Sequence, residues 1–200
     1  MRVFERLQPL WKAIPEGFRY KVWRIVGPGF QEAYARQLLA RPAKLAVKNH
    51  KTPLVVAGLF STANGIGEAA RSTYRSLEAA GLDPIAVDLS EQLAPVDMNS
   101  EIKCQPMPDD LEGTLILQLN GPETLAALHH LGMKRGRRWY VIGYWAWELP
   151  SFPKNWHRAF PFLSETWAVS QFTAGVIRQH PKSSASPAPT YHVLAGNRLC

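Results

Sequence analysis

The sequence predicts an α/β protein: a Rossmann-like, three-layer domain with a mostly parallel sheet, preceded by a basic helical leader. From Thr52 onward, short apolar runs alternate with stretches of helical periodicity, which is typical of parallel strands covered by helices. Of the 200 residues, 46% are hydrophobic, which is enough for a packed core. The excess positive charge lies in the first 50 residues. We therefore expect a leader at 1–51, a domain at 52–182 and a linker-like tail at 183–200.

Five short apolar runs are expected to form the strands of this sheet. Each is bounded by turn-forming or helical segments, as buried parallel strands usually are. Long polar connections separate some of them, and the segment 91–113, with several prolines and acids, is the longest. The expected strands are at 54–59, 84–88, 114–119, 139–144 and 166–169.

Four helices are expected between or after these strands. The clearest is 66–80, where apolar residues recur at i, i+3 and i+4 and Gly81 follows as a stop. A second helix, 122–131, begins with Pro122 and Glu123, which both suit a first turn. The other two are expected near 154–163 and at 171–179, the latter capped by the Ser170 hydroxyl.

The leader is the source of the net charge. Residues 1–50 contain ten Lys or Arg against three Glu, whereas the remaining residues contain thirteen of each sign. Aromatic residues are interleaved with these cations, and such segments suit the surface of an anionic membrane. A solvated face whose aromatics pack on the domain explains the composition equally well. No motif for nucleic-acid binding accompanies the charge.

The compartment is expected to be the cytoplasm, with peripheral attachment at the inner face of the membrane if the leader binds lipid. No apolar run approaches the roughly 18–20 residues of a membrane-spanning helix, and the N-terminus lacks the pattern of a secretory signal. The two cysteines, Cys104 and Cys200, form neither a disulfide framework nor a metal motif. No metal site is predicted.

A glycine pair follows the first expected strand. Gly65 and Gly67 match a loose dinucleotide-binding pattern, with Asp88 at the end of the next strand as the ribose-binding acid. A tight turn accounts for the two glycines as well. The pair also begins later than the pattern requires, and no tyrosine is followed by lysine four residues on, as a short-chain dehydrogenase would need. An NAD(P)-binding protein is therefore the less favoured alternative.

The stretch 139–172 combines many aromatic residues with a carboxylate. Glu148 follows Tyr144, Trp145 and Trp147 at the carboxyl end of an expected strand, which is where open α/β sheets bind ligands. Aromatic rings pack on the apolar faces of sugars, and a carboxylate accepts a hydroxyl hydrogen bond or a proton. The alternative is a buried acid whose oxygens accept backbone N–H bonds.

Four segments together resemble the N-terminal half of family-4 glycosyltransferases, which are two-domain enzymes of the B-type fold. The resemblance extends over about residues 54–180 and is most specific in the third segment. It implies transfer of a sugar from a nucleotide sugar to a saccharide or lipid-linked acceptor, without a resident cofactor. The segments are GLFSTANGIGEAAR (58–71), LNGPE (119–123), YVIGYWAWELPSFP (140–153) and ETWAVSQF (165–172).

This resemblance also assigns roles. The loop of Gly65 and Gly67 would face the donor phosphates. Glu148 would stand on the acceptor side, where its carboxylate is the candidate catalytic group. Asn120 stands where many family members have a histidine. The acceptor side would be lined by Asn120, Glu123, Tyr144 and Trp145.

The donor-binding half of such an enzyme has no counterpart in these 200 residues, since its paired glutamates would follow Glu165 and no glutamate does. The sequence therefore predicts a truncated, split or frame-disrupted enzyme that is inactive alone. In a split enzyme the donor domain would be on a separate chain. A non-catalytic binding or vestigial fragment is the alternative.

Overall fold

The computed structural model describes residues 29, 33, 35–44, 52–179 and 190–193. The chain divides into two compact units, residues 1–37 and 38–200. In the first unit the described residues are helical, and the rest of the leader predicted at 1–51 lies mostly outside the described residues. The second unit contains the sheet.

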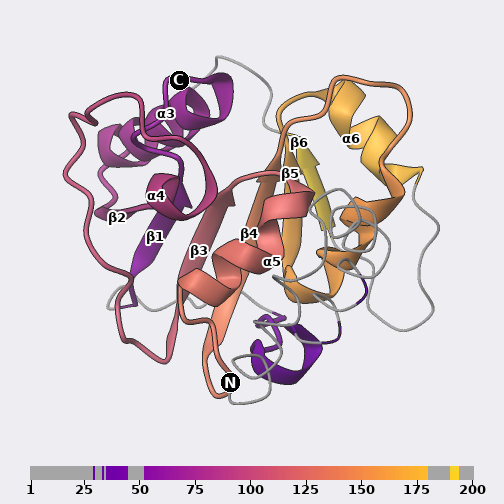
Figure 1. Cartoon of the computed structure of the whole chain (residues 1–200), viewed down its shortest axis with the longest axis horizontal. Coiled ribbons are helices and arrows are strands. Elements are labelled where there is room, and N and C mark those ends of the chain that lie inside the picture. The colour runs from indigo at the N-terminus through magenta and orange to yellow at the C-terminus, as the bar shows by residue number, and fades with distance from the viewer. Residues whose placement is uncertain (1–28, 30–32, 34, 45–51, 180–189, 194–200) are drawn as a thin grey trace, which may run out of the picture. The chain divides into compact units, whose positions relative to one another are not determined.

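The sheet has six parallel strands in the order β2-β1-β3-β4-β5-β6 (Figure 1). β1 (Leu54–Gly58) lies in the interior, between β2 (Pro84–Asp88) and β3 (Glu112–Gln118). The other half consists of β4 (Arg138–Trp145), β5 (Glu165–Ala168) and β6 (Thr190–Val193). The parallel sheet confirms the predicted α/β class.

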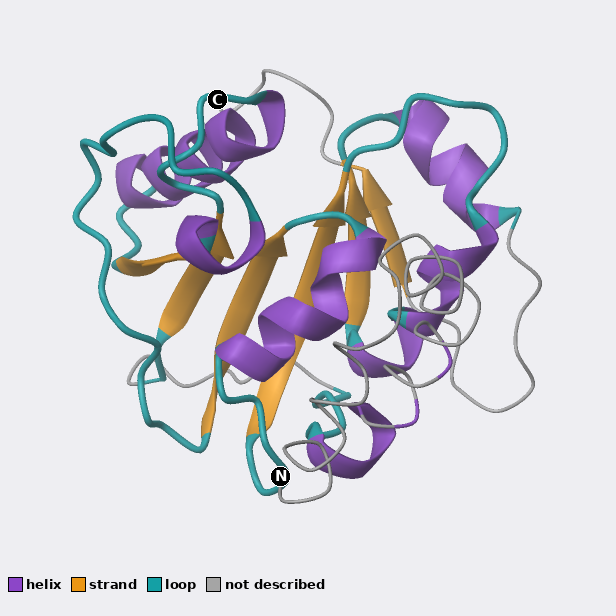
Figure 2. Ribbon diagram, in the orientation of Figure 1, coloured by secondary structure: helices purple, strands orange, loops and turns teal. Residues whose placement is uncertain are grey.

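Helices follow most strands and return the chain to the start of the next one (Figure 2). With the strands pointing upward in Figure 1, α5 lies in front of the sheet and β4 lies to the right of β3, which is the right-handed sense. The helices are α3 (Gly65–Ala79), α4 (Ser90–Leu93), α5 (Gly121–His130) and α6 (Gln171–Arg178), with two 3-10 helices, η1 (Lys154–Arg158) and η2 (Phe160–Phe162).

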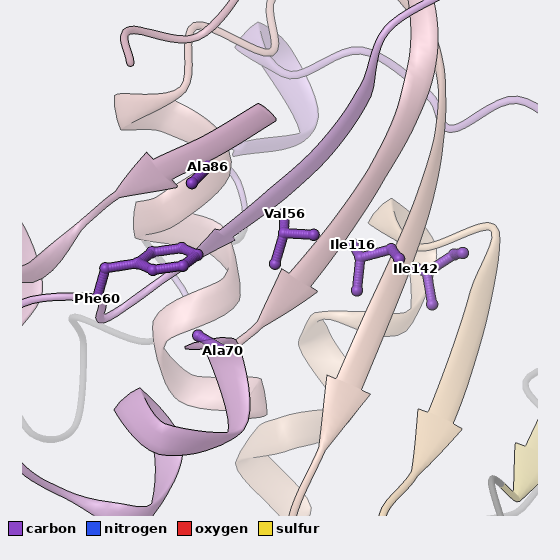
Figure 3. Packing of buried hydrophobic residues seen from close by; sticks show 6 residues of the cluster. All are labelled: Val56, Phe60, Ala70, Ala86, Ile116 and Ile142. Carbon is purple, nitrogen blue, oxygen red and sulfur yellow. The ribbon is translucent and has the colours of Figure 1, made fainter. Parts of the chain in front are cut away.

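The core on one face of the sheet is a row of side chains that are in register. Val56 lies beside Ala86 on β2 and Ile116 on β3, and Ile116 lies beside Ile142 on β4. Phe60, in the loop after β1, and Ala70 of α3 pack on this row (Figure 3). Because side chains alternate along a strand, the neighbouring residues Val55, Leu115 and Val141 are buried on the other face.

Two local expectations differ from the structure. Residues 154–163 form two short 3-10 helices and not one α-helix, with Pro153 at the start and Pro161 inside the segment; proline removes a backbone donor and disfavours a continued helix. The tail expected as a linker at 183–200 contributes β6, whose residues pair with β5 from Glu165↔Thr190 to Ala168↔Val193.

Candidate functional site

The strand order reverses between β1 and β3, which creates a topological switch point. In open α/β sheets, ligands bind outside the carboxyl ends of the strands at such a point. Three segments lie at this edge: the loop 59–64 after β1, residues 119–123 after β3, and residues 146–153 after β4. These segments contain Asn120, Glu123 and Glu148. The other selected residues flank them, since Tyr144 and Trp145 end β4 and Gly65 and Gly67 begin α3.

The loop after β1 is held by Asp88 at the end of β2. The Asp88 carboxylate accepts hydrogen bonds from Phe60 N (3.0 Å) and Ser61 Oγ (2.6 Å) on the loop, and from Ser90 N (2.9 Å) and Ser90 Oγ (2.6 Å). Burial opposes ionisation, but these hydrogen bonds outweigh it and lower the pKa of Asp88. Both oxygens of Asp88 thus accept hydrogen bonds from the loop, whereas a ribose-binding acid would leave them available to a ligand.

Arg71 and Asp97 fix the same loop from two further directions. The buried Arg71 donates from Nη1 to Phe60 O (2.9 Å) and Thr62 O (3.1 Å), and its Nε pairs with Glu68 at 3.0 Å. Ala63 N donates to Asp97 Oδ1 at 2.6 Å. The polar groups of this loop are therefore turned toward the protein, and three carboxylates lie around it.

Gly65 and Gly67 occupy different environments within the first turn of α3. A Cβ on Gly67 would lie 2.3 Å from Thr62 O and 2.6 Å from Leu59 O, so only glycine fits there. The Gly67 N–H donates to Asn64 Oδ1, the helix N-cap, at 2.8 Å. A Cβ on Gly65 would meet nothing within 4 Å, and Gly65 is exposed. Of the two, Gly65 is the one whose surroundings are open to a phosphate.

Asn120 connects the carboxyl ends of β3 and β4. Its Oδ1 accepts a hydrogen bond from Ala146 N at 3.0 Å, and its carbonyl accepts one from Thr124 Oγ1 at 3.0 Å. The predicted acceptor residue is therefore also a clamp between two strand ends.

The segment that carries Glu148 is held at a second point. Thr173 Oγ1 of α6 donates to Trp147 O at 2.8 Å, and Trp147 Nε1 donates to Ser151 O at 2.9 Å. Glu148 itself is exposed, which contradicts the interpretation of a buried acid. Its carboxylate is thus presented to solvent from a segment whose backbone is fixed on both sides.

Glu123 is a partly buried acid at this edge. It lies in the first turn of α5, and its Oε2 is buried without a hydrogen-bond partner in the described part of the chain. Burial raises the pKa of Glu123, although its own backbone N–H opposes the shift. The acid is therefore easier to protonate than an exposed glutamate.

Tyr144 and Trp145 point to opposite faces of the sheet, because they are neighbours on one strand. Tyr144 packs edge-on against Trp167, with ring centroids 5.9 Å apart, and burial raises its pKa. Trp145 is fully buried against Phe152 and Phe160. Its ring offers no surface to an acceptor, so it supports the site only through packing.

Sequence reasoning missed the exposed apolar side chains that follow the carboxyl ends of β4 and β5. Leu149 is 57% exposed and Phe172, in the first turn of α6, is 52% exposed. Val169, which follows β5, is also exposed, and its N–H donates to Trp145 O at 3.3 Å. The sequence did contain a signal for Phe172. This residue lies two positions after the capping Ser170, in the first turn of a helix that begins at the carboxyl end of β5.

In residues 35–44 and 52–179, no three His, Cys, Asp or Glu side chains are grouped as they would be around a metal ion. No helix in the described parts of the chain is both long and apolar enough to span a bilayer.

No protein-family model, no curated protein and no solved structure matches this chain.

Proposed function

We propose that this chain is the acceptor-side domain of a glycosyltransferase, which acts together with a donor domain that binds a nucleotide sugar. The observation that carries the proposal is the placement of Glu148. It is exposed at the carboxyl edge, on a backbone held by Asn120 through Ala146 N and by Thr173 through Trp147 O. The motif string around Glu148 supports the same assignment.

In the proposed reaction, Glu148 takes the proton of an acceptor hydroxyl as that oxygen bonds to the anomeric carbon of the donor. The bond from this carbon to the diphosphate breaks, and the nucleoside diphosphate leaves with the electron pair. Holding the acceptor near the donor lowers the entropic part of the barrier, and the base supplies a further factor of roughly 10²–10⁴. Leu149 and Phe172 would pack on the apolar face of the acceptor sugar.

Donor phosphates would meet this domain at Gly65, because the Gly67 N–H already donates to Asn64. The carboxylates of Asp88, Asp97 and Glu68 around the loop make it a weak anion site by itself. Neutralisation of the leaving group is therefore assigned mainly to the donor domain.

Titration of the ¹⁵N-labelled chain with maltoheptaose and mannohexaose tests acceptor binding. The indole N–H signal of Trp147 should shift with saturation, whereas the indole of Trp139, which is fully buried and bonded to Asp110 O, should not. Release of UDP from UDP-glucose or of GDP from GDP-mannose, with a donor domain added, then tests catalysis. Binding without release under any combination would identify a non-catalytic binding module, and absence of saccharide shifts would contradict the proposal.

A further inference from the structure

A cluster of exposed cations lies at the opposite edge of the sheet from the candidate site. It is centred on the turn between α5 and β4, which reads Lys134-Arg-Gly-Arg-Arg138. Lys134, Arg135 and Arg138 are exposed, and Arg138 begins β4 at its amino end. In Figure 1 this turn is at the lower end of β4, away from the arrowhead.

Residues 38–44 bring two more cations to this turn. Leu39 forms an antiparallel bridge with Lys134, and Arg135 N donates to Leu38 O at 3.2 Å. Ala40 N and Ala43 N donate to Met133 O and Trp139 O, both at 2.8 Å. The exposed Arg41 and Lys44 are therefore fixed beside the exposed cations of the turn.

Residues 109–112 complete the surface and supply both acids and an apolar side chain. Arg138 N donates to Leu111 O at 2.7 Å, and Leu111 is 67% exposed. Arg137 pairs with Asp109 at 3.4 Å and Arg138 pairs with Glu112. The segments 38–44, 109–112 and 134–138 nevertheless contain six cations against three acids, so the surface is positive.

We infer that this surface, the amino-edge patch of Leu38, Arg41, Lys44, Leu111, Lys134, Arg135 and Arg138, binds an anionic lipid bilayer. Cations near such a surface are attracted to its negative potential. The exposed Leu38 (39%) and Leu111 give the patch apolar groups that can enter the boundary between headgroups and acyl chains. The phosphates of a nucleic acid would pair with the cations but would give Leu38 and Leu111 no apolar partner. The observations therefore favour lipid.

The patch does not depend on the proposed function. It shares Leu38, Arg41 and Lys44 with the leader predicted at 1–51, but these residues, like Leu111 and 134–138, belong to the unit that contains the sheet. β4 has eight residues, and at about 3.3 Å per residue it separates the patch from the carboxyl edge by about 25 Å. Docking through the patch would therefore turn Glu148 away from the lipid. If the proposed function holds, this geometry favours an extended saccharide acceptor over a short lipid headgroup.

Flotation of the full chain with vesicles of phosphatidylcholine and phosphatidylglycerol (7:3) tests the inference. Lys134→Glu/Arg135→Glu should weaken binding by about tenfold or more at low salt. Lys103→Glu/Lys154→Glu is the matched control, since all four residues are exposed and both pairs lower the net charge from +7 to +3. Equal binding of the two double variants would assign all lipid binding to the leader or to net charge and overturn the inference.

A second pair of variants distinguishes lipid from polyanions in general. Leu111→Ala should weaken vesicle binding several-fold, whereas Leu149→Ala, at a leucine of similar exposure, should leave it unchanged. Binding of a 20-nucleotide duplex DNA is measured beside the vesicles. If the DNA binds as tightly as the vesicles and Leu111→Ala changes neither, the patch is a general polyanion surface and the inference is wrong. Thermal melts confirm that each variant is folded.

Discussion

The two halves of the carboxyl edge are built for different tasks. The half over β1 and β2 contains the glycine pair that most resembles a phosphate-binding loop. However, Asp88 and Asp97 already accept hydrogen bonds from N–H groups that such a loop would offer a ligand, and Arg71 donates to a carbonyl of the loop. The half over β4 and β5 uses Asn120 and Thr173 to hold a backbone segment and leaves Glu148 exposed.

A binding pattern in a sequence therefore does not reveal which groups its hydrogen-bond donors and acceptors will join. A loop whose donors and acceptors are satisfied within the protein contributes rigidity, because a ligand would have to replace bonds already made. A segment whose backbone is satisfied and whose side chains are exposed can contact a ligand without such a cost. Variants in the first half should therefore change stability, and variants in the second half should change activity.

Gly67→Ala should have the largest effect of all. The new Cβ would meet two backbone carbonyl oxygens at 2.3 and 2.6 Å, and relieving these contacts requires the loop or the helix start to move. We expect a loss of about 3 kcal/mol or more in the free energy of unfolding, measured by urea denaturation.

Gly65→Ala is the matched control, two residues away in the same turn and with open space around the new Cβ. It should change stability by less than about 0.5 kcal/mol. Comparable losses for the two variants would mean that the turn is not packed as described. The loop over β1 and β2 would then not be the rigid, internally bonded half of the edge, which we call the locked half.

Glu148→Gln should give the next largest effect, on activity alone. With the donor domain present, turnover should fall by about 10²-fold, as expected for a lost general base. The melting temperature should remain within error, because the side chain is exposed. Glu78→Gln, at an exposed position on α3, controls for the loss of one negative charge. Unchanged turnover in Glu148→Gln would remove this residue from the proposed mechanism.

Asp88→Asn should lower stability by about 2 kcal/mol at pH 7, because an amide cannot replace the charged acceptor of four hydrogen bonds. The lowered pKa of Asp88 means that its contribution is complete above the unfolded pKa of about 3.9 and is lost as the pH falls through the folded value. Urea denaturation between pH 7 and pH 3 should therefore show the variant and the wild type converging at acid pH.

Asp83→Asn serves as the comparison for Asp88, since Asp83 is an exposed acid that precedes the same strand. Asp83→Asn should change the free energy of unfolding by little at each pH measured. If Asp88→Asn were equally neutral, the carboxylate would not be holding the loop, and the polar groups of the loop would be available to a ligand after all.

The sequence predicted the sheet well because its signals are local. Apolar runs such as 54–59 and 84–88 and the capping Ser170 fix strands and helix starts within a residue or two. β6 was missed because its four residues follow a Pro- and Ser-rich stretch and acquire their structure by pairing with β5. Pairing between distant segments leaves little trace in composition.

The candidate site was predictable in its location and less so in its details. The carboxyl end of β4 follows from the strand pattern, but the use of Asn120 as a clamp depends on Ala146, 26 residues away. Alternation along a strand already places Tyr144 and Trp145 on different faces. The burial of Trp145 depends on Phe152 and Phe160, which follow it in the chain and pack on its ring. The cations at 134–138 escaped notice because the charge was summed over residues 51–200, where the two signs cancel.

Glu123→Gln should have the smallest effect. The sign of the change in the free energy of unfolding reports whether this acid is stabilised by internal hydrogen bonds, as Asp88 is in the locked half, or belongs with the exposed half over β4 and β5. Burial raises the folded pKa of Glu123, so the unfolded chain, with an ordinary pKa of about 4.3, releases this proton more easily. Stability therefore falls as the pH rises from the unfolded pKa through the folded one. The uncharged variant avoids this loss and should be slightly more stable than the wild type at pH 7–8.

The gain from Glu123→Gln should stay below about 1 kcal/mol, since the side chain is only partly buried and solvent screens its charge. At pH 3, well below the unfolded pKa of about 4.3, both proteins carry a neutral side chain and should unfold at nearly the same urea concentration. Glu91→Gln, at an exposed acid of α4, should show no such pH-dependent difference. A variant less stable than the wild type at pH 7 would mean that the ionised Glu123 carboxylate is stabilised by the fold, and the residue would then join Asp88 as part of the locked half.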